Sequence, residues 1–195
     1  FAGTEAERIQ GIEQAFGLKE AALLMATRGG YGLSRLLPLL NFTELATQLN
    51  SNRHVLCGHS DITSLQLALL QAGAEPETLL HGPMACFDFG SELGADPQTT
   101  SHFSHAVRTR QVEIHWQAKQ LEVARIEGAV WGGNLTLLCS LLGTPWLPTV
   151  PGGILILEDV NEPAYKIERM LLQLLHAGIL AQQSAVLLGN FCEPQ

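Results

Sequence analysis

Two strand–loop–helix units in the first part of the chain constrain its fold more than any other feature. Each unit combines a short apolar strand, a tight turn and a segment with apolar residues at helical spacing. Repeated units of this kind place parallel strands in one sheet with helices on its faces, so we predict an α/β fold. The first unit spans a strand at Ala21–Ala26, a glycine-rich turn at Arg28–Gly32 and a helix over Leu33–Leu40; the second spans a strand at His54–Gly58 and a helix from Asp61 to Gly73.

The middle of the chain changes character and divides the sequence into parts. Gln111–Trp116 alternates apolar and polar residues and Val123–Trp131 does so less regularly, which predicts two half-exposed antiparallel strands. We therefore expect an N-terminal domain over 1–107, a linker or crossing over 108–130 and part of a mixed α/β second domain over 131–195. Further elements predicted around this linker are a polar helix over 99–109, a helix from 135 through 142, a buried strand at 154–157, a helix over 163–177 and a strand at 185–189.

Composition narrows the class of protein. The net charge is −8, with only 11 Lys and Arg and no basic run, which argues against a nucleic-acid partner. No apolar stretch approaches the ~20 residues that span a bilayer, so we expect no membrane association. The four cysteines are widely spaced, without a C-x-x-C pair, and we expect them to be reduced in a cytoplasmic protein.

Ser60 is the first candidate for chemistry, within Gly58-His-Ser-Asp-Ile62. A serine on the sharp turn between a strand and a helix holds its hydroxyl above the sheet, next to free backbone N–H groups that can stabilise an oxyanion. The usual elbow reads G-x-S-x-G, whereas Ile62 occupies its fifth position here. Taken alone, Ser60 or Asp61 is more typical of a helix N-cap than of a nucleophile.

Three other features carry weaker signals. The turn Arg28–Gly32 lets backbone approach a ligand and could form an anion-binding nest, or it is simply a tight βα turn. Glu158 ends a buried strand, where open α/β folds place functional groups, although such a carboxylate is often a cap or an ion-pair partner. His102 and His105 stand three apart, but no third ligand is evident, so we expect a solvated helix face and no metal or other cofactor.

The order and wording of seven segments resemble the LD-carboxypeptidase family, the muramoyltetrapeptide carboxypeptidases. The similarity covers nearly the whole chain. The segments are Phe1-Ala-Gly-Thr4, Arg28-Gly-Gly-Tyr-Gly32 with Arg35-Leu-Leu37, Gly58-His-Ser-Asp61, Gly82-Pro-Met84, Trp131-Gly-Gly-Asn-Leu135, Gly143-Thr-Pro145, and Leu157-Glu-Asp-Val160 with Glu168-Arg-Met-Leu171.

This resemblance implies a serine peptidase, a hydrolase of cell-wall peptides with a Ser-Glu-His triad in the cleft between two domains. Ser60 would be the nucleophile and Glu158 would orient the base. The elbow geometry adds an oxyanion hole made by the backbone N–H of Asp61 and one from the Gly29-Gly30 turn. Arg28 is a candidate for binding the substrate's terminal carboxylate.

The implied reaction releases the terminal D-alanine of a cytoplasmic murein tetrapeptide during peptidoglycan recycling. A homodimer is also implied, because family members are often dimers. Two alternatives stay open: the branch of the family that cleaves peptidyl-nucleotide antibiotics, and a non-catalytic α/β module that binds an anion or a peptide through the glycine turn.

The chain departs from the family pattern at its ends. The family's first strand would precede Phe1, and its catalytic histidine would follow Gln195. His176, the only histidine after Glu158, falls within a predicted helix and matches no family motif. We therefore expect a chain that is truncated at both ends and inactive alone.

Overall fold

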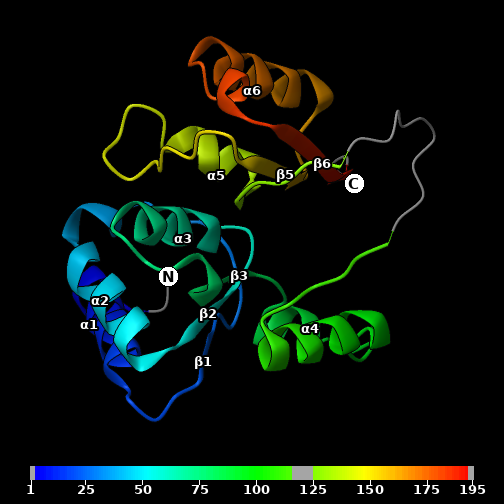
Figure 1. Ribbon diagram of the computed structural model, residues 1–195. Helices are drawn as coiled ribbons and strands as arrows, with labels where there is room; N and C mark the ends of the chain where they lie inside the picture. Colours follow the sequence, from blue (N-terminus) through cyan, green and yellow to red (C-terminus); the bar gives the residue numbers. More distant parts are fainter. Residues whose placement is uncertain (1–2, 116–124, 193–195) are drawn as a thin grey trace.

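The predicted α/β fold is confirmed by the computed structural model, which describes residues 3–115 and 125–192. Within these residues the chain forms two three-stranded parallel sheets, in the orders β1-β2-β3 and β4-β5-β6 (Figure 1). The strands are β1 (Leu23–Met25), β2 (Val55–Gly58), β3 (Leu79–His81), β4 (Val130–Asn134), β5 (Ile154–Val160) and β6 (Ala185–Cys192). The α-helices are α1 (Glu5–Gly17), α2 (Phe42–Asn52), α3 (Ile62–Gln71), α4 (Pro97–Thr109), α5 (Leu135–Ser140) and α6 (Ala164–His176).

The first sheet is built around β2, whose residues are all buried. β2 pairs in parallel with β1 and with β3, so that Gly58 lies opposite His81. Apolar side chains from the surrounding helices and loops form the core on this sheet, among them the fully buried Leu36, Leu49 and Leu69. Each such side chain contributes about 1.5–3 kcal/mol by leaving water.

The second sheet is centred on β5, which alternates between two environments. Leu155 and Leu157 point into a core shared with Leu138 of α5 and Leu174 of α6. Because successive side chains of a strand point to opposite faces, Ile156 and Glu158 lie on the other face of the sheet. That face is turned toward the first sheet and α3, away from α5 and α6.

Helix α3 joins the two halves of the molecule. It packs on the first sheet and also contacts α5 and β4 (Figure 1). The backbone N–H of Asn134 donates a buried hydrogen bond of 3.1 Å to Thr63 Oγ1 on α3. The contact brings the carboxyl end of β4 to the start of the helix that follows Ser60.

The helix predicted over 33–40 is wrong. Those residues form turns and the short 3₁₀ helix η1 (Leu37–Leu39), because Pro38 has no N–H to continue an α-helix. Asn41 then starts α2 instead, and its side chain accepts a hydrogen bond from the N–H of Glu44. The periodic leucines reflect burial, since Leu33, Leu36, Leu37 and Leu40 are all in the core.

The two predicted antiparallel strands are also wrong. Residues 111–115 form no strand, and Trp116 lies outside the described residues, as do 117–124. Residues 125–129 are not in a strand, and Val130 and Trp131 belong to β4, which pairs in parallel with β5. The alternation in residues 111–115 has another cause, because Val112 and Ile114 line an apolar cavity.

Helix α4 and two of the cysteines can be compared with the sequence predictions. The polar helix predicted over 99–109 forms as α4, two residues longer at its start. Cys57 and Cys139, which stand in apolar segments, are buried. Among the described residues, no helix is both long and apolar enough to cross a membrane.

Candidate active site

Ser60 lies on a tight turn between the end of β2 and the start of α3. Its backbone φ of 57° is left-handed, a conformation that costs a non-glycine residue about 1–2 kcal/mol. Such strain is typical of a serine elbow that lifts its hydroxyl above a sheet. Within residues 3–115 and 125–192 the hydroxyl makes no hydrogen bond, so it is available to a ligand or a base.

Gly58 and Ile62 explain how this elbow differs from the usual pattern. A Cβ at Gly58 would lie 3.0 Å from Ala26 Cβ and 3.0 Å from Ile62 Cγ1, so a side chain does not fit there. The first glycine of the elbow is thus required by packing. Ile62 takes the position of the second glycine and packs directly over the first.

Asp61 occupies the N-cap position of α3, but its side chain does not cap the helix. The buried carboxylate instead accepts a hydrogen bond of 2.8 Å from the backbone N–H of Leu33. Burial raises the pKa of Asp61, while this hydrogen bond and the charge of Arg8 act in the opposite direction. The residue after Ser60 therefore ties the end of the glycine turn to the elbow.

The glycine turn lies against Ser60. A Cβ at Gly29 would be 2.9 Å from Ser60 Cβ and 3.0 Å from Ser60 Oγ, so these two residues are in contact. In the described parts of the chain the N–H groups of Gly29, Gly30 and Asp61 have no hydrogen-bond partner. Free donors beside a serine hydroxyl are what an oxyanion requires. Arg28 is exposed on the same turn and makes no ion pair with any described residue.

Glu158 lies on the face of β5 that is turned toward the first sheet, with 25% of its side chain exposed. Its Oε1 atom is buried and makes no hydrogen bond within the described residues. Burial and the charge of Asp159 raise the pKa of Glu158, and the charge of His59 and the amide of Asn134 offset part of this shift.

Asp159 faces the opposite side of the strand and has a structural role. It accepts hydrogen bonds from Asn134 Nδ2 at 3.0 Å and from the backbone N–H of Thr136 at 2.9 Å. Asn134 in turn caps α5, because its Oδ1 accepts from the N–H of Leu137. Because side chains alternate along β5, Asp159 binds the start of α5, whereas Glu158 faces the first sheet.

Two histidines beside Ser60 were missed as site residues. His81 ends β3, and its Nε2 lies 3.8 Å from Glu158 Oε1. His59 precedes the serine, and its ring packs edge-on against His81 with centroids 6.4 Å apart. The signal was present, because His59 lies inside the elbow motif and His81 directly precedes Gly82-Pro-Met84.

A carboxylate fixes the ring of His59. Asp88 Oδ2 lies 3.1 Å from His59 Nε2 and also accepts a 2.7 Å hydrogen bond from the backbone N–H of Met84. Asp88 belongs to the turn η3 (Ala85–Phe89). Burial against neighbouring atoms, together with the nearby charge of His59, lowers the pKa of His81 to about 4, although solvent still reaches part of the ring.

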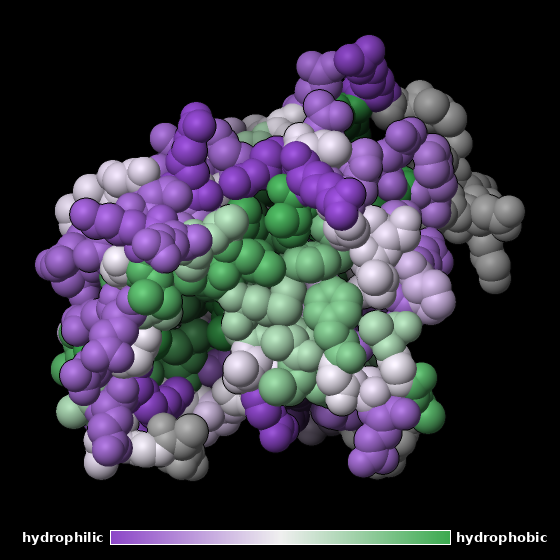
Figure 2. Space-filling model, turned by 90° about the horizontal axis from the view of Figure 1, so that it is seen from below, coloured by the Kyte–Doolittle hydropathy of each residue, from purple (hydrophilic) through white to green (hydrophobic). Residues whose placement is uncertain are grey.

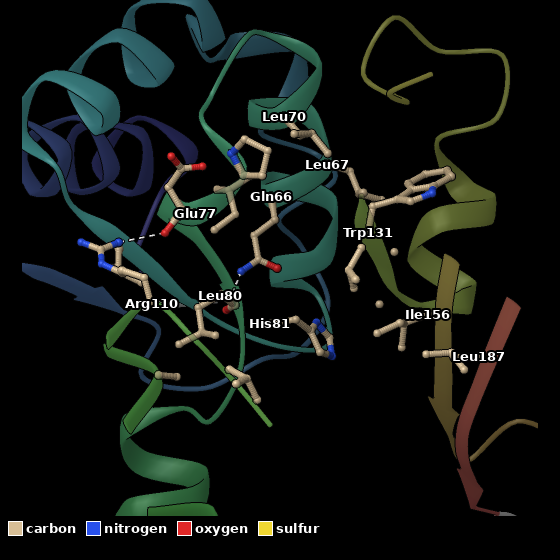
Figure 3. Close-up of a pocket in the computed structure, with 18 of the residues that line it drawn as sticks. Gln66, Leu67, Leu70, Glu77, Leu80, His81, Arg110, Trp131, Ile156 and Leu187 are labelled. Atoms are coloured by element: carbon tan, nitrogen blue, oxygen red, sulfur yellow. Dashed lines mark hydrogen bonds between the residues drawn. The ribbon is translucent and has the colours of Figure 1, made fainter. Parts of the chain in front are cut away.

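An apolar cavity of about 760 Å³ adjoins this site. Leu67 and Leu80 line one wall, Ile156 and Leu187 line the other, and His81 stands at its edge (Figure 3). Apolar side chains also gather in a hollow when the molecule is seen from below (Figure 2). Ser60 does not line the cavity, so the candidate chemistry lies beside it.

The remaining histidine candidates lie elsewhere. His102 and His105 are on α4, and the exposed His176 ends α6. In the two described stretches, no three His, Cys, Asp or Glu side chains are grouped to hold a metal ion.

The fold and the site define a two-sheet α/β protein with an elbow serine, a glycine turn against it and a glutamate near the carboxyl end of β5. Models of the LD-carboxypeptidase N-terminal domain and C-terminal domain match residues 1–81 and 127–195, respectively. The chain belongs to the LD-carboxypeptidase family, a family of peptidases.

Individual relatives agree with this assignment. The chain is 34% identical to the murein tetrapeptide carboxypeptidase of Pseudomonas aeruginosa over 98% of its own length and 63% of that protein. The crystal structure of muramoyltetrapeptide carboxypeptidase from Oxalobacter formigenes superposes with a TM-score of 0.91 at 39% identity, covering all of this chain and 64% of that one. The microcin C7 self-immunity protein of Escherichia coli is 26% identical over 96% of this chain and 61% of that protein. The chain thus spans somewhat less than two thirds of the length of these relatives.

Proposed function

We propose that this protein is a serine carboxypeptidase that releases the terminal D-alanine of a murein tetrapeptide by hydrolysing its L,D peptide bond. The observation that carries the proposal is the strained elbow of Ser60, with a free hydroxyl and free backbone donors beside it, in a chain of the LD-carboxypeptidase family. The product tripeptide would be reused in peptidoglycan recycling in the cytoplasm.

In the proposed mechanism Ser60 Oγ attacks the carbonyl carbon of the bond before D-alanine. A histidine takes the hydroxyl proton and passes it to the leaving amine, which departs as D-alanine and leaves an acyl-enzyme. Water, deprotonated by the same histidine, then releases the shortened peptide. The N–H groups of Asp61 and of Gly29 or Gly30 would stabilise the tetrahedral oxyanion.

Glu158 would orient that histidine and stabilise its imidazolium form. Support comes from Glu158 Oε1, a buried acceptor without a hydrogen-bond partner in the described residues, which is suited to a ring N–H. Within the described residues neither His59 nor His81 makes a hydrogen bond to Ser60, whose hydroxyl has no partner there. We assign the base to a histidine outside this chain, and we expect the 195 residues alone to be inactive.

Recognition of the substrate's terminal carboxylate is assigned to Arg28. Its guanidinium is exposed on the turn that contacts Ser60, and it is not engaged by an acid within the described residues. Arginine binds carboxylates through two parallel hydrogen bonds, which suits an exopeptidase. The proposed assembly is a homodimer.

Similarity to the microcin C7 self-immunity protein favours a second candidate, cleavage of a peptidyl-nucleotide antibiotic by the same serine. A non-catalytic α/β module that binds an anion or a peptide is the third. The three differ in whether Ser60 is needed and in which substrate is consumed.

The test is D-alanine release from murein tetrapeptide by a protein that contains this chain and the histidine. Ser60→Ala and Glu158→Gln are compared with Ser51→Ala, an exposed serine on α2. We expect a loss of at least ~10³-fold for Ser60→Ala, a large loss for Glu158→Gln and no change for the control. Equal release by wild type and Ser60→Ala would contradict the proposal, and Ser60-dependent cleavage of only an aminoacyl-nucleotide would favour the second candidate.

A further inference from the structure

We infer that His81 is a positioning residue for Glu158, reaching from the first sheet to the second through the space that Gly133 leaves open. This inference rests on the proposed function of Glu158. It assigns a role to a side chain that sequence patterns did not single out.

His81 is carried by the same sheet as the nucleophile. It pairs with Gly58 at the end of β2, two residues before Ser60. Its Nε2 lies 3.8 Å from Glu158 Oε1 on β5 of the other sheet. The contact therefore links β3, the neighbour of the strand that leads to the nucleophile, with the strand that carries the acid.

Gly133 on β4 makes room for this ring. A Cβ on Gly133 would lie 3.0 Å from both Cε1 and Nδ1 of His81 and 2.8 Å from Thr63 Oγ1. The backbone φ of 131° also disfavours any side chain at this position. The second glycine of Trp131-Gly-Gly-Asn134 thus has a specific use, which is to admit the imidazole between the two sheets.

Glu158 needs a neighbour of this kind. Its Oε1 is buried, and no described residue donates a hydrogen bond to it. On the side of β6, a Cβ at Gly189 would lie 3.3 Å from Glu158 Cβ, so that side offers contact but no donor. The amide of Asn134 also acts on this carboxyl, and from the first sheet His81 Nε2 lies 3.8 Å from Oε1. At 3.8 Å the pair is longer than a hydrogen bond but close enough for an electrostatic interaction.

The surroundings of His81 keep its ring neutral. Burial, and after it the charge of His59, lowers the pKa of His81, and His59 is itself held by Asp88. On the other sheet the charged groups are Glu158 and Asp159. A neutral imidazole can give an N–H to Glu158 without cancelling its charge, which leaves the carboxylate able to stabilise a catalytic imidazolium.

The test is a titration of the Glu158 carboxyl by carbon NMR in the full protein, with the signal assigned through Glu158→Gln. His81→Phe keeps the ring shape but removes the N–H, whereas His81→Gln keeps a donor. His105→Phe, at an exposed position on α4, is the control. We expect the pKa of Glu158 to rise by about one unit in His81→Phe, because its ionised form loses the nearby polar N–H of the ring, and to stay near the wild-type value in the other two.

Kinetics supply a second measurement. His81→Phe should lower kcat for D-alanine release about tenfold with KM within about twofold, and His81→Gln should recover most of it. An unchanged pKa of Glu158 in His81→Phe would overturn the inference. Release that does not depend on Ser60 would instead contradict the proposed function, and the titration would still decide whether His81 acts on Glu158.

Discussion

The carboxylate of Asp61 accepts a hydrogen bond of 2.8 Å from the backbone N–H of Leu33, so the residue after the candidate nucleophile holds the end of the glycine turn. Both partners are buried. The elbow and the turn, 28 residues apart in sequence, are therefore joined by one side chain.

Replacing Asp61 tests this link. Asp61→Ala leaves the N–H of Leu33 without its acceptor, and we expect the free energy of unfolding to fall by about 1–3 kcal/mol. Asp61→Asn keeps an acceptor oxygen and should lose clearly less. Urea unfolding of the two variants provides the comparison. Equal losses for Asn and Ala would show that the hydrogen bond is not what stabilises this position.

Gly29 should tolerate no side chain if Ser60 is to stay in place. A methyl group there would lie 2.9 Å from Ser60 Cβ, so Gly29→Ala must displace the serine or the turn. We expect the rate of Ser60 acylation to fall at least about tenfold, since small misplacements of reacting groups have large effects on rate. Gly11→Ala on α1, where a Cβ meets nothing within 4 Å, is the matched control and should leave the rate unchanged. A wild-type acylation rate in Gly29→Ala would show that the glycine turn is not part of the active site.

Backbone strain at Ser60 predicts an unusual order of stability. Glycine adopts a left-handed φ without cost. The free energy of unfolding of Ser60→Gly should therefore be about 1 kcal/mol larger than that of Ser60→Ala. At Ser101, an exposed position inside α4, the order should reverse, because glycine weakens a helix interior by about 1 kcal/mol relative to alanine. Thermal or urea unfolding of the four variants decides; the same order at both positions would argue against a strained elbow.

The raised pKa of Glu158 predicts how stability depends on pH. Because the folded-state pKa lies above the ordinary value of 4.5, the folded state binds this proton more tightly than the unfolded state. The resulting stabilisation is fully present below pH 4.5 and is lost as the pH rises through the folded-state pKa. Glu158→Gln cannot ionise, so it should be more stable than wild type at pH 7, and the gain should shrink as the pH falls through the folded-state pKa toward 4.5.

Glu168→Gln on the exposed side of α6 is the matched control for this measurement. It should show no such pH-dependent gain. A Glu158→Gln variant that is less stable than wild type at pH 7 would mean that the ionised carboxylate has stabilising partners that the structure does not show.

Sequence patterns were reliable where local chemistry and burial agree. The strand before Ser60 is short, apolar and followed by a helix with a clear stop at Gly73, and it forms as predicted. α1 was missed although Thr4 and Glu7 form a capping box, a signal that is readable from a threonine three residues before a glutamate. β3 was missed because a three-residue strand has too few positions to show a pattern.

In the site, too, sequence patterns predicted some residues and missed others. Ser60 follows the end of β2 and Glu158 lies near the carboxyl end of β5, and sequence patterns locate such positions well. The contact between His81 and Glu158 joins residues 77 positions apart and depends on how the sheets pack, which no local pattern encodes. The role of Gly133 is equally non-local, since the atoms that exclude its side chain belong to His81 and Thr63.

Covalent trapping at Ser60 tests the central claim most directly. The protein is treated with murein tetrapeptide or a D-amino-acid-terminated acylating probe, quenched in acid and mapped by peptide mass spectrometry. We expect one adduct, on the peptide that contains Ser60, which is absent in Ser60→Ala and accumulates more slowly in Glu158→Gln. An adduct on another residue, or D-alanine release that persists in Ser60→Ala, would contradict the assignment of Ser60 as the nucleophile.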